Sequence, residues 1–414
     1  MARSVNSKQR EARDQPAAPG SLQELLGVFR GCFSAWTFPV FCALACGLIA
    51  QSARRTVCGM LVGAGLSQTW SHHRAHRFFS HACWSIEQVS AVLARLVVRL
   101  LVADGAPITV AIDDTLFSRR GPKVHAASWF HDGSAVGKTK IGYGNNWVIL
   151  AIVVRLGFLD RPIALPVGFA LVQKNSKDSS RLALARRLVE ALAATLPGRT
   201  IHVVADSAYA GKALRGLPGS VTWTTRLRSN ASLYGLAPAR SGKRGRPRTK
   251  GAKLARLATL ANTMSFSPTT VTRYGTTSTV STAVRRCLWY GVFGPQQVQV
   301  VFVRDKSQDG YDIALVTTDL ARRPGHRTLR GALVDRGRDR RREAARWRRP
   351  GPQPARASGK ARAPLRARRE HPRHLLVGDG GSSPRRRRSG PRSPRGIGRR
   401  LNPRSSTCSP SSVG

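Results

Sequence analysis

Acidic residues are scarce in this chain of 414 residues, which has 69 lysines and arginines but 21 aspartates and glutamates. The formal charge of +48 at pH 7 excludes an ordinary metabolic enzyme as the default interpretation. It indicates a polyanionic partner, most often nucleic acid. Because so few acids are present, any acids that end buried strands are informative about function.

Cys-x-x-Cys pairs are absent, although the chain has seven cysteines. An odd number without such pairs excludes a secreted disulfide framework and favours the reducing cytoplasm, where we expect association with the nucleoid. Three cysteines and three histidines of the N-terminal region could form a metal site: Cys42, Cys46, Cys58, His72, His73 and His76. Because free cysteines on apolar helices are usually core residues, we favour that interpretation.

A signal peptide and a long uninterrupted apolar run are also missing. Residues 1–19 are polar, and we expect them, with Gly20, to be disordered. Residues 32–50 are apolar, but Pro39 lies among them, and the sequence on both sides has a helical pattern. We therefore predict a buried core helix rather than a membrane span, and no membrane partner.

Residues 21–103 are predicted to form a helical domain that binds DNA ends. Apolar residues recur at three- and four-residue spacing in residues 21–33 and 85–102. Ser85, followed by Glu87 and Gln88, is a plausible helix start. The segment 71–84 is dense in histidine and arginine, which fits either phosphate contact or a solvated helix face.

From residue 104 the hydrophobic pattern changes to that of strands. The order strand, strand, strand, helix, strand indicates an α/β fold with a mixed sheet. The strands are expected at 108–112, 145–157, 161–172, 200–205, 287–294, 297–305 and 312–319, and the helices at 179–196 and 210–214.

Aspartates follow two of these buried strands. Asp113 and Asp114 come after one strand, and Asp206 comes after another. Neighbouring carboxylates repel each other unless a cation neutralises them. Two Mg²⁺ ions about 4 Å apart can activate an attacking oxygen and stabilise a leaving oxygen in phosphodiester chemistry. These acids therefore favour a nuclease-like site, although Asp114 or Asp206 could simply cap the next turn.

A basic insertion at about 228–262 has its highest charge density at 243–250. Its Arg-Pro-Arg is an extended cationic element of the kind that fits a narrow minor groove, although a solvated loop is the simpler alternative. We expect DNA contacts from Lys243, Arg244, Arg246, Arg248 and Lys250, and from Arg119, Arg120 and Lys123 near the first aspartates.

Three segments carry a specific family resemblance: AIDDTLFSRRGPKV at 111–124, the stretch 126–156 from AASWFHDG to ILAIVVRL, and HVVADSAYAGKALRGLP at 202–218. Together they resemble the DDE-superfamily transposases of bacterial insertion sequences. The closest resemblance is to the group whose catalytic glutamate lies in a Tyr-Arg-Glu-Lys signature. The resemblance covers about residues 20–320, and its motifs occur in order.

The resemblance implies a ribonuclease-H-like catalytic domain at 104–320. It implies two metal ions, Mg²⁺ or alternatively Mn²⁺, held by Asp, Asp and Glu. It also implies a homo-oligomer on DNA that cleaves the terminal repeats and joins the freed 3′-hydroxyl to target DNA. Asp113 matches the first carboxylate, with Asp114 as the alternative by adjacency, and Asp206 matches the second.

The third carboxylate is where the chain departs from the family. Tyr, Arg, Glu and Lys should follow residue 320 with two, three and six intervening residues, but no such series occurs. Glu343 is the one nearby acid in a segment whose sequence could form a helix, and no tyrosine follows Tyr311. We therefore leave the third acid unknown. Residues 321–414 are an Arg/Pro/Gly-rich tail, expected to be disordered, in which 27 of 28 basic residues are arginine.

Reading the tail one base forward permits the missing signature. With suitable synonymous codons for residues 324–345, the shifted frame encodes PAIERYAARWSIEVAIEDAKQ. The codon for the signature glutamate would then straddle the codons of Arg336 and Gly337. We therefore predict a frameshift near 320–324 and an impaired enzyme. A genuine basic DNA-binding tail is the rival explanation. The alternative functions are a non-catalytic, inhibitory or remnant DNA-binding derivative and, less consistent with the charge, an unrelated metal-dependent phosphohydrolase.

Overall fold

The computed structural model describes residues 18–51, 56–119, 121, 123–133, 135, 139–174, 179–239, 246–273, 276–305 and 309–320. The tail at 321–414 lies outside these ranges, as do residues 1–17. Four residues considered above are therefore not described: Arg120, Lys243, Arg244 and Glu343.

The N-terminal region is helical, as its periodicity predicts. Its elements are α2 (Gly20–Gly27), the 3-10 turn η1 (Arg30–Cys32), α3 (Thr37–Ala50), α4 (Val57–Gly63), α5 (His72–Ser80) and α6 (Ile86–Leu101). The predicted start of the last helix is confirmed, because the Ser85 hydroxyl accepts a hydrogen bond from the Gln88 N–H at 3.2 Å. None of the described helices is both long enough and apolar enough to cross a bilayer.

Helices α3, α4 and α5 share a small hydrophobic core. Its buried members are Val40, Ala43, Leu44, Leu61, Leu66, Trp70, Ala75 and Phe78. The backbones of α3 and α4 approach closely where Gly47 and Gly63 meet. A Cβ built on Gly47 would lie 1.8 Å from the Met60 carbonyl oxygen. This crossing therefore requires glycine at position 47.

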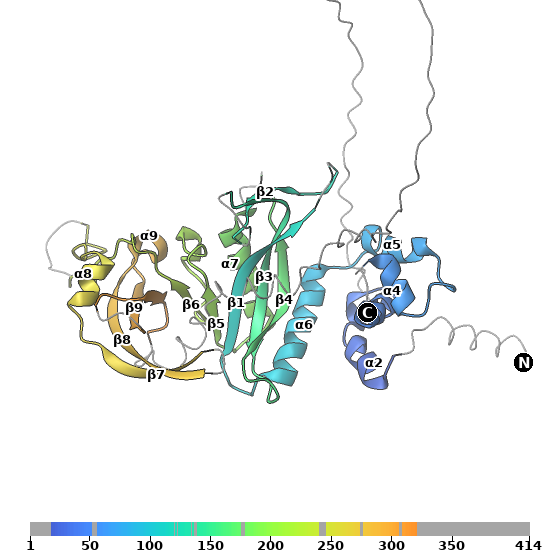
Figure 1. The fold of residues 1–414 in the computed structure, drawn as a ribbon, viewed down its shortest axis with the longest axis horizontal. Coiled ribbons are helices and arrows are strands. Elements are labelled where there is room, and N and C mark those ends of the chain that lie inside the picture. Colours follow the sequence, from blue (N-terminus) through green and yellow to red (C-terminus); the bar gives the residue numbers. More distant parts are fainter. Residues whose placement is uncertain are drawn as a thin grey trace, which may run out of the picture. The chain divides into compact units, whose positions relative to one another are not determined.

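A ten-stranded mixed sheet follows, in the order β2-β3-β1-β5-β6-β10-β9-β8-β7, with β4 paired to β3 (Figure 1). The strands are β1 (Ile108–Ser118), β2 (Ser128–His131), β3 (Ile141–Val154), β4 (Ile163–Leu171), β5 (Ile201–Ala205), β6 (Val221–Arg226), β7 (Ser267–Arg273), β8 (Thr276–Leu288), β9 (Gln297–Arg304) and β10 (Ile313–Thr317). The remaining helical elements are α7 (Arg181–Thr195), η3 (Lys212–Leu214), α8 (Leu257–Asn262) and α9 (Tyr290–Phe293).

The central strands carry the predicted topology. β1 is antiparallel to β3, and β3 is antiparallel to β4. On its other side β1 is parallel to β5, which is parallel to β6. α7 connects β4 to β5. Apart from the short β2, this is the ribonuclease-H-like arrangement of three antiparallel and two parallel strands, so the predicted fold is confirmed. Beyond β6, the strands β10, β9, β8 and β7 extend the sheet by antiparallel pairing.

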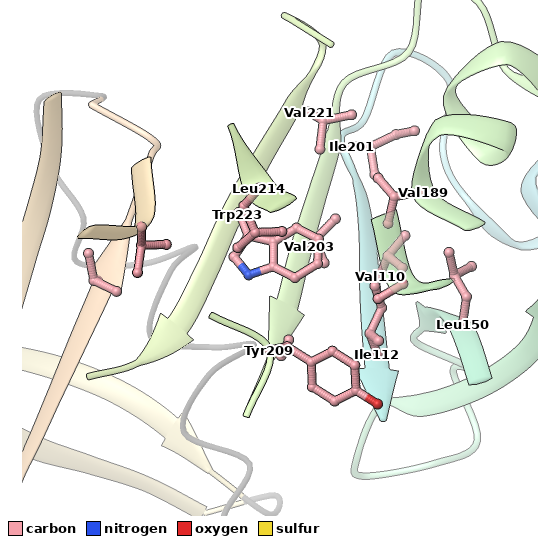
Figure 2. Close-up of a cluster of buried hydrophobic side chains, with 14 of the residues drawn as sticks. Val110, Ile112, Leu150, Val189, Ile201, Val203, Tyr209, Leu214, Val221 and Trp223 are labelled. Atoms are coloured by element: carbon pink, nitrogen blue, oxygen red, sulfur yellow. The ribbon is translucent and has the colours of Figure 1, made fainter. Parts of the chain in front are cut away.

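One face of the central sheet is buried beneath α6 and α7. Alternate residues of β1 supply it, and Ile108, Val110 and Ile112 are fully buried. They belong to a large cluster that also contains Val98 of α6 and Val189 of α7. Figure 2 shows the centre of this cluster, where β1, β3, β5, β6 and α7 all contribute side chains. The apolar runs predicted as strands therefore build the main core.

Three local predictions differ from the structure. β1 continues to Ser118 instead of ending at residue 112, because β3 is long enough to pair with it as far as Gly144. The segment 210–214 contains a 3-10 turn rather than a helix, and Gly216 at φ 66° soon follows it. Residues 287–294 were expected to form one strand. Instead β8 ends within this segment, and the short helix α9 follows and ends before Gly294, which has φ 65°.

Replacing Gly47 with alanine should destabilise the N-terminal helices. The new methyl group would overlap the Met60 carbonyl, and overpacking of this kind costs about 1–3 kcal/mol or more. Gly27→Ala is the matched control, because a Cβ on this helical glycine meets no atom within 4 Å. Thermal unfolding followed by circular dichroism would compare the variants, and equal melting temperatures would show that α3 and α4 can separate at no cost.

Candidate active site

Asp113 and Asp206 follow the last parallel pair between β1 and β5. Ile112 and Ala205 are register partners. Asp113 is the next residue of β1, and Asp206 is the first residue after β5. The sequence places both residues directly after apolar strands, and the pairing of β1 with β5 brings these two strand positions together. Ligands of parallel sheets bind at the carboxyl ends of the strands, and Asp206 lies at that end of β5. Asp113 lies within β1, at the point where the parallel pairing with β5 stops.

The face that bears Asp113 is more accessible than the buried face. Ala111, Asp113 and their neighbour Ile149 on β3 are partly exposed, whereas Val110 and Ile112 on the opposite face are fully buried. Asp206 is exposed. A cation or a phosphate could therefore approach this side of the sheet without disturbing the core.

Asp114 projects from the opposite face and has polar partners there. Asn146 Nδ2 donates a hydrogen bond to Asp114 Oδ2 at 3.1 Å, and the Tyr209 hydroxyl donates to Oδ1 at 3.2 Å. Arg181 Nε lies 3.4 Å from Oδ2. A half-buried carboxylate with a guanidinium and two donors is already compensated, so it does not need a metal ion.

Tyr209 remains protonated in this environment. Burial raises the pKa of its hydroxyl well above the ordinary value, and the negative charges of Asp114 and Asp113 raise it further. The neutral phenol therefore acts as a donor to Asp114. It also connects the turn after β5 with β1, so it stabilises the relative position of the two strands that carry the aspartates.

These partners of Asp114 were not predicted from the sequence. Asn146 is fully buried on β3, directly before the apolar run at 147–154. A buried amide normally requires a hydrogen-bond partner. That signal could have singled out Asn146. Arg181 is the first residue of α7 and carried no comparable signal.

Asp206 also organises its own turn. Its Oδ1 accepts a hydrogen bond from the Ala208 N–H. Its backbone carbonyl accepts from the Tyr209 N–H at 3.0 Å and from the Thr225 hydroxyl at 2.6 Å. Asp206 therefore does cap the turn that follows β5, as the alternative interpretation predicted. It does not exclude a second role, because the carboxylate is exposed and has two oxygens.

No third ligand joins the aspartate pair within the part of the chain that the structure describes. Among those residues the one group of three or more Asp, Glu, His or Cys side chains close enough to share an ion is elsewhere, in the N-terminal helices. Asp319, which follows β10, lies close enough to His202 to oppose the lowering of the His202 pKa by burial. The aspartate pair thus suits a hard cation in ligand type, but it offers two carboxylates where the family uses three acids.

The predicted DNA contacts are exposed where the structure describes them. This holds for Arg119, Lys123, Arg246, Arg248 and Lys250. Arg119 directly follows β1, the strand that carries Asp113. The Lys250 ammonium lies 4.2 Å from the ring centroid of Tyr234 and 5.0 Å from that of Tyr290, so these rings hold part of the insertion in place.

The sheet is ribonuclease-H-like, with Asp113 within β1 and Asp206 directly after its parallel neighbour β5. The family model described as "DDE superfamily endonuclease" matches residues 29–295, and the chain belongs to this family. Endonucleases of this family generally use divalent metal ions. The match includes both aspartates and ends before β9, so it says nothing about residues beyond 295.

The structure is also similar to the cryo-EM structure of the piggyBac transposase synaptic complex with hairpin DNA. The sequence identity is 13%, the TM-score is 0.32, and the match covers 69% of this chain and 51% of that chain. This chain therefore spans about half the length of that transposase, and the likeness is too distant to support an argument. No curated protein sequence matches the chain.

Replacing Asp114 and Asp113 separately should distinguish their roles. Asp114→Asn removes the charge that faces Arg181 and should lower the free energy of unfolding by about 1–3 kcal/mol. Asp113→Asn keeps the side-chain size and leaves the contacts of Asp114 in place, so it should lower this free energy by less. Urea unfolding of the two variants measures both effects. An equal loss in both variants would contradict the structural role given to Asp114.

Proposed function

We propose that this chain derives from a transposase of a bacterial insertion sequence, a DNA endonuclease and strand transferase that acts at the element's ends. The observation that supports the proposal is that Asp113 and Asp206 directly follow Ile112 and Ala205, the last parallel pair between β1 and β5. Membership of the DDE endonuclease family supports the same chemistry. The terminal repeats and target DNA are the proposed partners, bound by a homo-oligomer.

Asp113 and Asp206 are the proposed metal ligands, with Mg²⁺ as the expected ion and Mn²⁺ as an alternative. Bound ions of this kind activate an attacking oxygen and stabilise the leaving oxygen. Asp114 is a positioning residue, because its contacts with Asn146 and Tyr209 tie β1 to β3 and to the turn after β5. Exposed basic residues beside the site, including Arg119, would neutralise phosphates of the bound DNA.

We further propose that this polypeptide is impaired. A carboxylate pair without a third acid should bind Mg²⁺ weakly, and the frameshift predicted near 320–324 would have removed that acid with its helix. The proposed organisation is an end-binding helical domain at 21–103, a catalytic domain at 104–320 with the basic insertion at about 228–262, and an out-of-frame tail at 321–414.

Cleavage should depend on the reading frame. The substrate is a supercoiled plasmid that carries the DNA flanking the coding sequence on both sides, incubated with Mg²⁺ or Mn²⁺. The present chain should cleave slowly or not at all. A chain with residues 1–320 followed by the +1 frame should cleave at the element's ends, and Asp206→Ala in that chain should abolish the cleavage. Gel analysis of nicked and linear plasmid gives the readout.

Two results would overturn parts of this proposal. Robust cleavage by the present chain that is lost on Asp206→Ala would refute the impairment. Failure of the restored-frame chain to cleave, although it folds and binds the plasmid, would count against the transposase activity itself. The nucleotide sequence across codons 318–346 tests the frameshift directly, because the +1 frame must encode the Tyr-Arg-Glu-Lys series.

A non-catalytic DNA-binding derivative is the second candidate function. The absence of a third acid near Asp113 and Asp206 among the described residues favours it. The exposed arginines of the insertion support DNA contact that does not require catalysis. Such a protein could occupy the element's ends and inhibit an intact transposase.

DNA binding should depend on the insertion and not on the aspartates. Arg246→Ala with Arg248→Ala should weaken binding to the flanking DNA and reduce the slope of log K against log salt by about two. Asp113→Asn with Asp206→Asn should leave binding intact. Arg155→Ala is a control, because this exposed arginine follows β3 near the opposite end of β1 from Asp113. Fluorescence anisotropy at several salt concentrations measures the slope, and an equal effect of the control would show that the contact is not local.

A further inference from the structure

Cys58, His72 and His76 come together on the surface of the N-terminal helices. Cys58 lies on α4, and the two histidines lie one turn apart on α5. One ligand atom from each of the three lies within 4.8 Å of the others, and all three side chains are exposed. We propose that these residues form a zinc site that joins α4 to α5. This site does not depend on the proposed transposase function.

The ligand set is suited to zinc. Thiolate sulfur and imidazole nitrogen are the ligands that Zn²⁺ takes in proteins, whereas Mg²⁺ prefers oxygen. Histidines at positions i and i+4 lie on the same face of a helix. The ring centroids of His72 and His76 are accordingly 4.1 Å apart. With Zn–S of about 2.3 Å and Zn–N of about 2.0 Å, tetrahedral ligand atoms lie about 3.3–3.5 Å apart.

The three ligand atoms therefore need to approach one another by at most about 1.5 Å. Rotation of exposed side chains can supply it, because the backbones that carry the ligands are already fixed. Leu61 on α4 and Phe78 on α5 are buried in the same small core. Thr56 and Ser71 cap the starts of the two helices through their side-chain oxygens. Three protein ligands leave the fourth position open to solvent.

The other sulfur and imidazole groups of this region do not belong to the cluster. Cys46 is buried in α3, and burial raises the pKa of its thiol. Burial likewise raises the pKa of the Cys42 thiol to about 11. Cys46 is therefore a core thiol, as predicted, and Cys42 is half-buried. The same prediction is wrong for Cys58, which is exposed because it lies on the surface of α4. His73 is exposed on α5 but lies outside the group of ligand atoms.

A bound ion would change the mechanics of this region. Between α4 and α5 the chain runs through residues 64–71, and the described contacts between these helices come from a small core. A metal cross-link adds a strong connection at the surface end of that core. It would also fix the orientation of α5, whose exposed residues include the basic Arg74 and Arg77. We therefore expect the ion to stabilise these helices and the presentation of their basic face.

Cobalt titration of the full chain tests the site. Metal-free, reduced protein should bind one Co²⁺ with the visible bands of tetrahedral coordination and a thiolate-to-cobalt charge-transfer band. Added Zn²⁺ should remove these bands and raise the melting temperature. Cys58→Ser should abolish the charge-transfer band, and His76→Ala should abolish the tetrahedral spectrum and the zinc-dependent rise in melting temperature.

Neighbouring groups provide matched controls. Cys83→Ser and His73→Ala each remove an exposed residue of the same type close by, and both should retain the parent's cobalt spectrum. Circular dichroism of the metal-free variants checks that Cys58→Ser and His76→Ala fold like the parent. Absence of the charge-transfer band in the parent, or its persistence in folded Cys58→Ser, would overturn the proposal. Cobalt at Asp113 and Asp206 would give no thiolate band, so failure of this site and failure of the proposed function remain distinguishable.

Discussion

The parallel pairing of β1 with β5 is the contact on which the candidate active site depends. These strands come from segments separated by β2, β3, β4 and α7, and their register brings Ile112 beside Ala205. Asp113 is the next residue of β1, and Asp206 is the first residue after β5. A shift in this register would change the distance along the sheet between these two positions. Tyr209 helps to hold the register, because it follows β5 and donates to Asp114 on β1.

Strand alternation assigns different chemistry to two adjacent carboxylates. Asp114 faces the side covered by α6 and α7, where Arg181 and Asn146 compensate its charge. Asp113 faces the more accessible side of the sheet. Adjacency in the sequence left both residues as candidates for the first ligand, and the register of β1 gives them different surroundings. The difference arises because helices cover one face of the sheet. The sequence does not show which face is covered until the order of the strands is known.

The sequence predicted the elements with strong apolar patterns and missed those without them. Val- and Ile-rich runs such as 108–112 and 200–205 were predicted as strands with little error at their starts. The hairpin of β7 and β8 was missed, because its residues are mainly threonine and serine and show no clear alternation of apolar side chains. The partners of Asp114 come from β3, α7 and the turn after β5. No local pattern connects these three segments, so the motif alone could not identify them.

The N-terminal histidines and cysteines illustrate the same limit. Six residues were candidates for a metal site by composition, and packing separates them into two kinds. Cys46 is buried on α3, whereas Cys58 is exposed on α4 near His72 and His76 of α5. Helical spacing pairs His72 with His76 but cannot show which cysteine is close to them. That choice depends on how the helices pack, and the close approach at Gly47 is part of that packing.

The charge of the chain divides into two unlike parts. Residues 1–320 carry 41 basic and 16 acidic residues, and residues 321–414 carry 28 basic and 5 acidic residues. In the first part the excess of +25 includes exposed residues beside a structured site, so its position has a physical meaning for DNA. In the tail, arginine supplies 27 of the 28 basic residues, and lysine supplies one. Selection for phosphate contacts would not exclude lysine, since both side chains bind phosphate. GC-rich codons read in a shifted frame would produce this bias, so the tail's charge should not be counted as support for DNA binding.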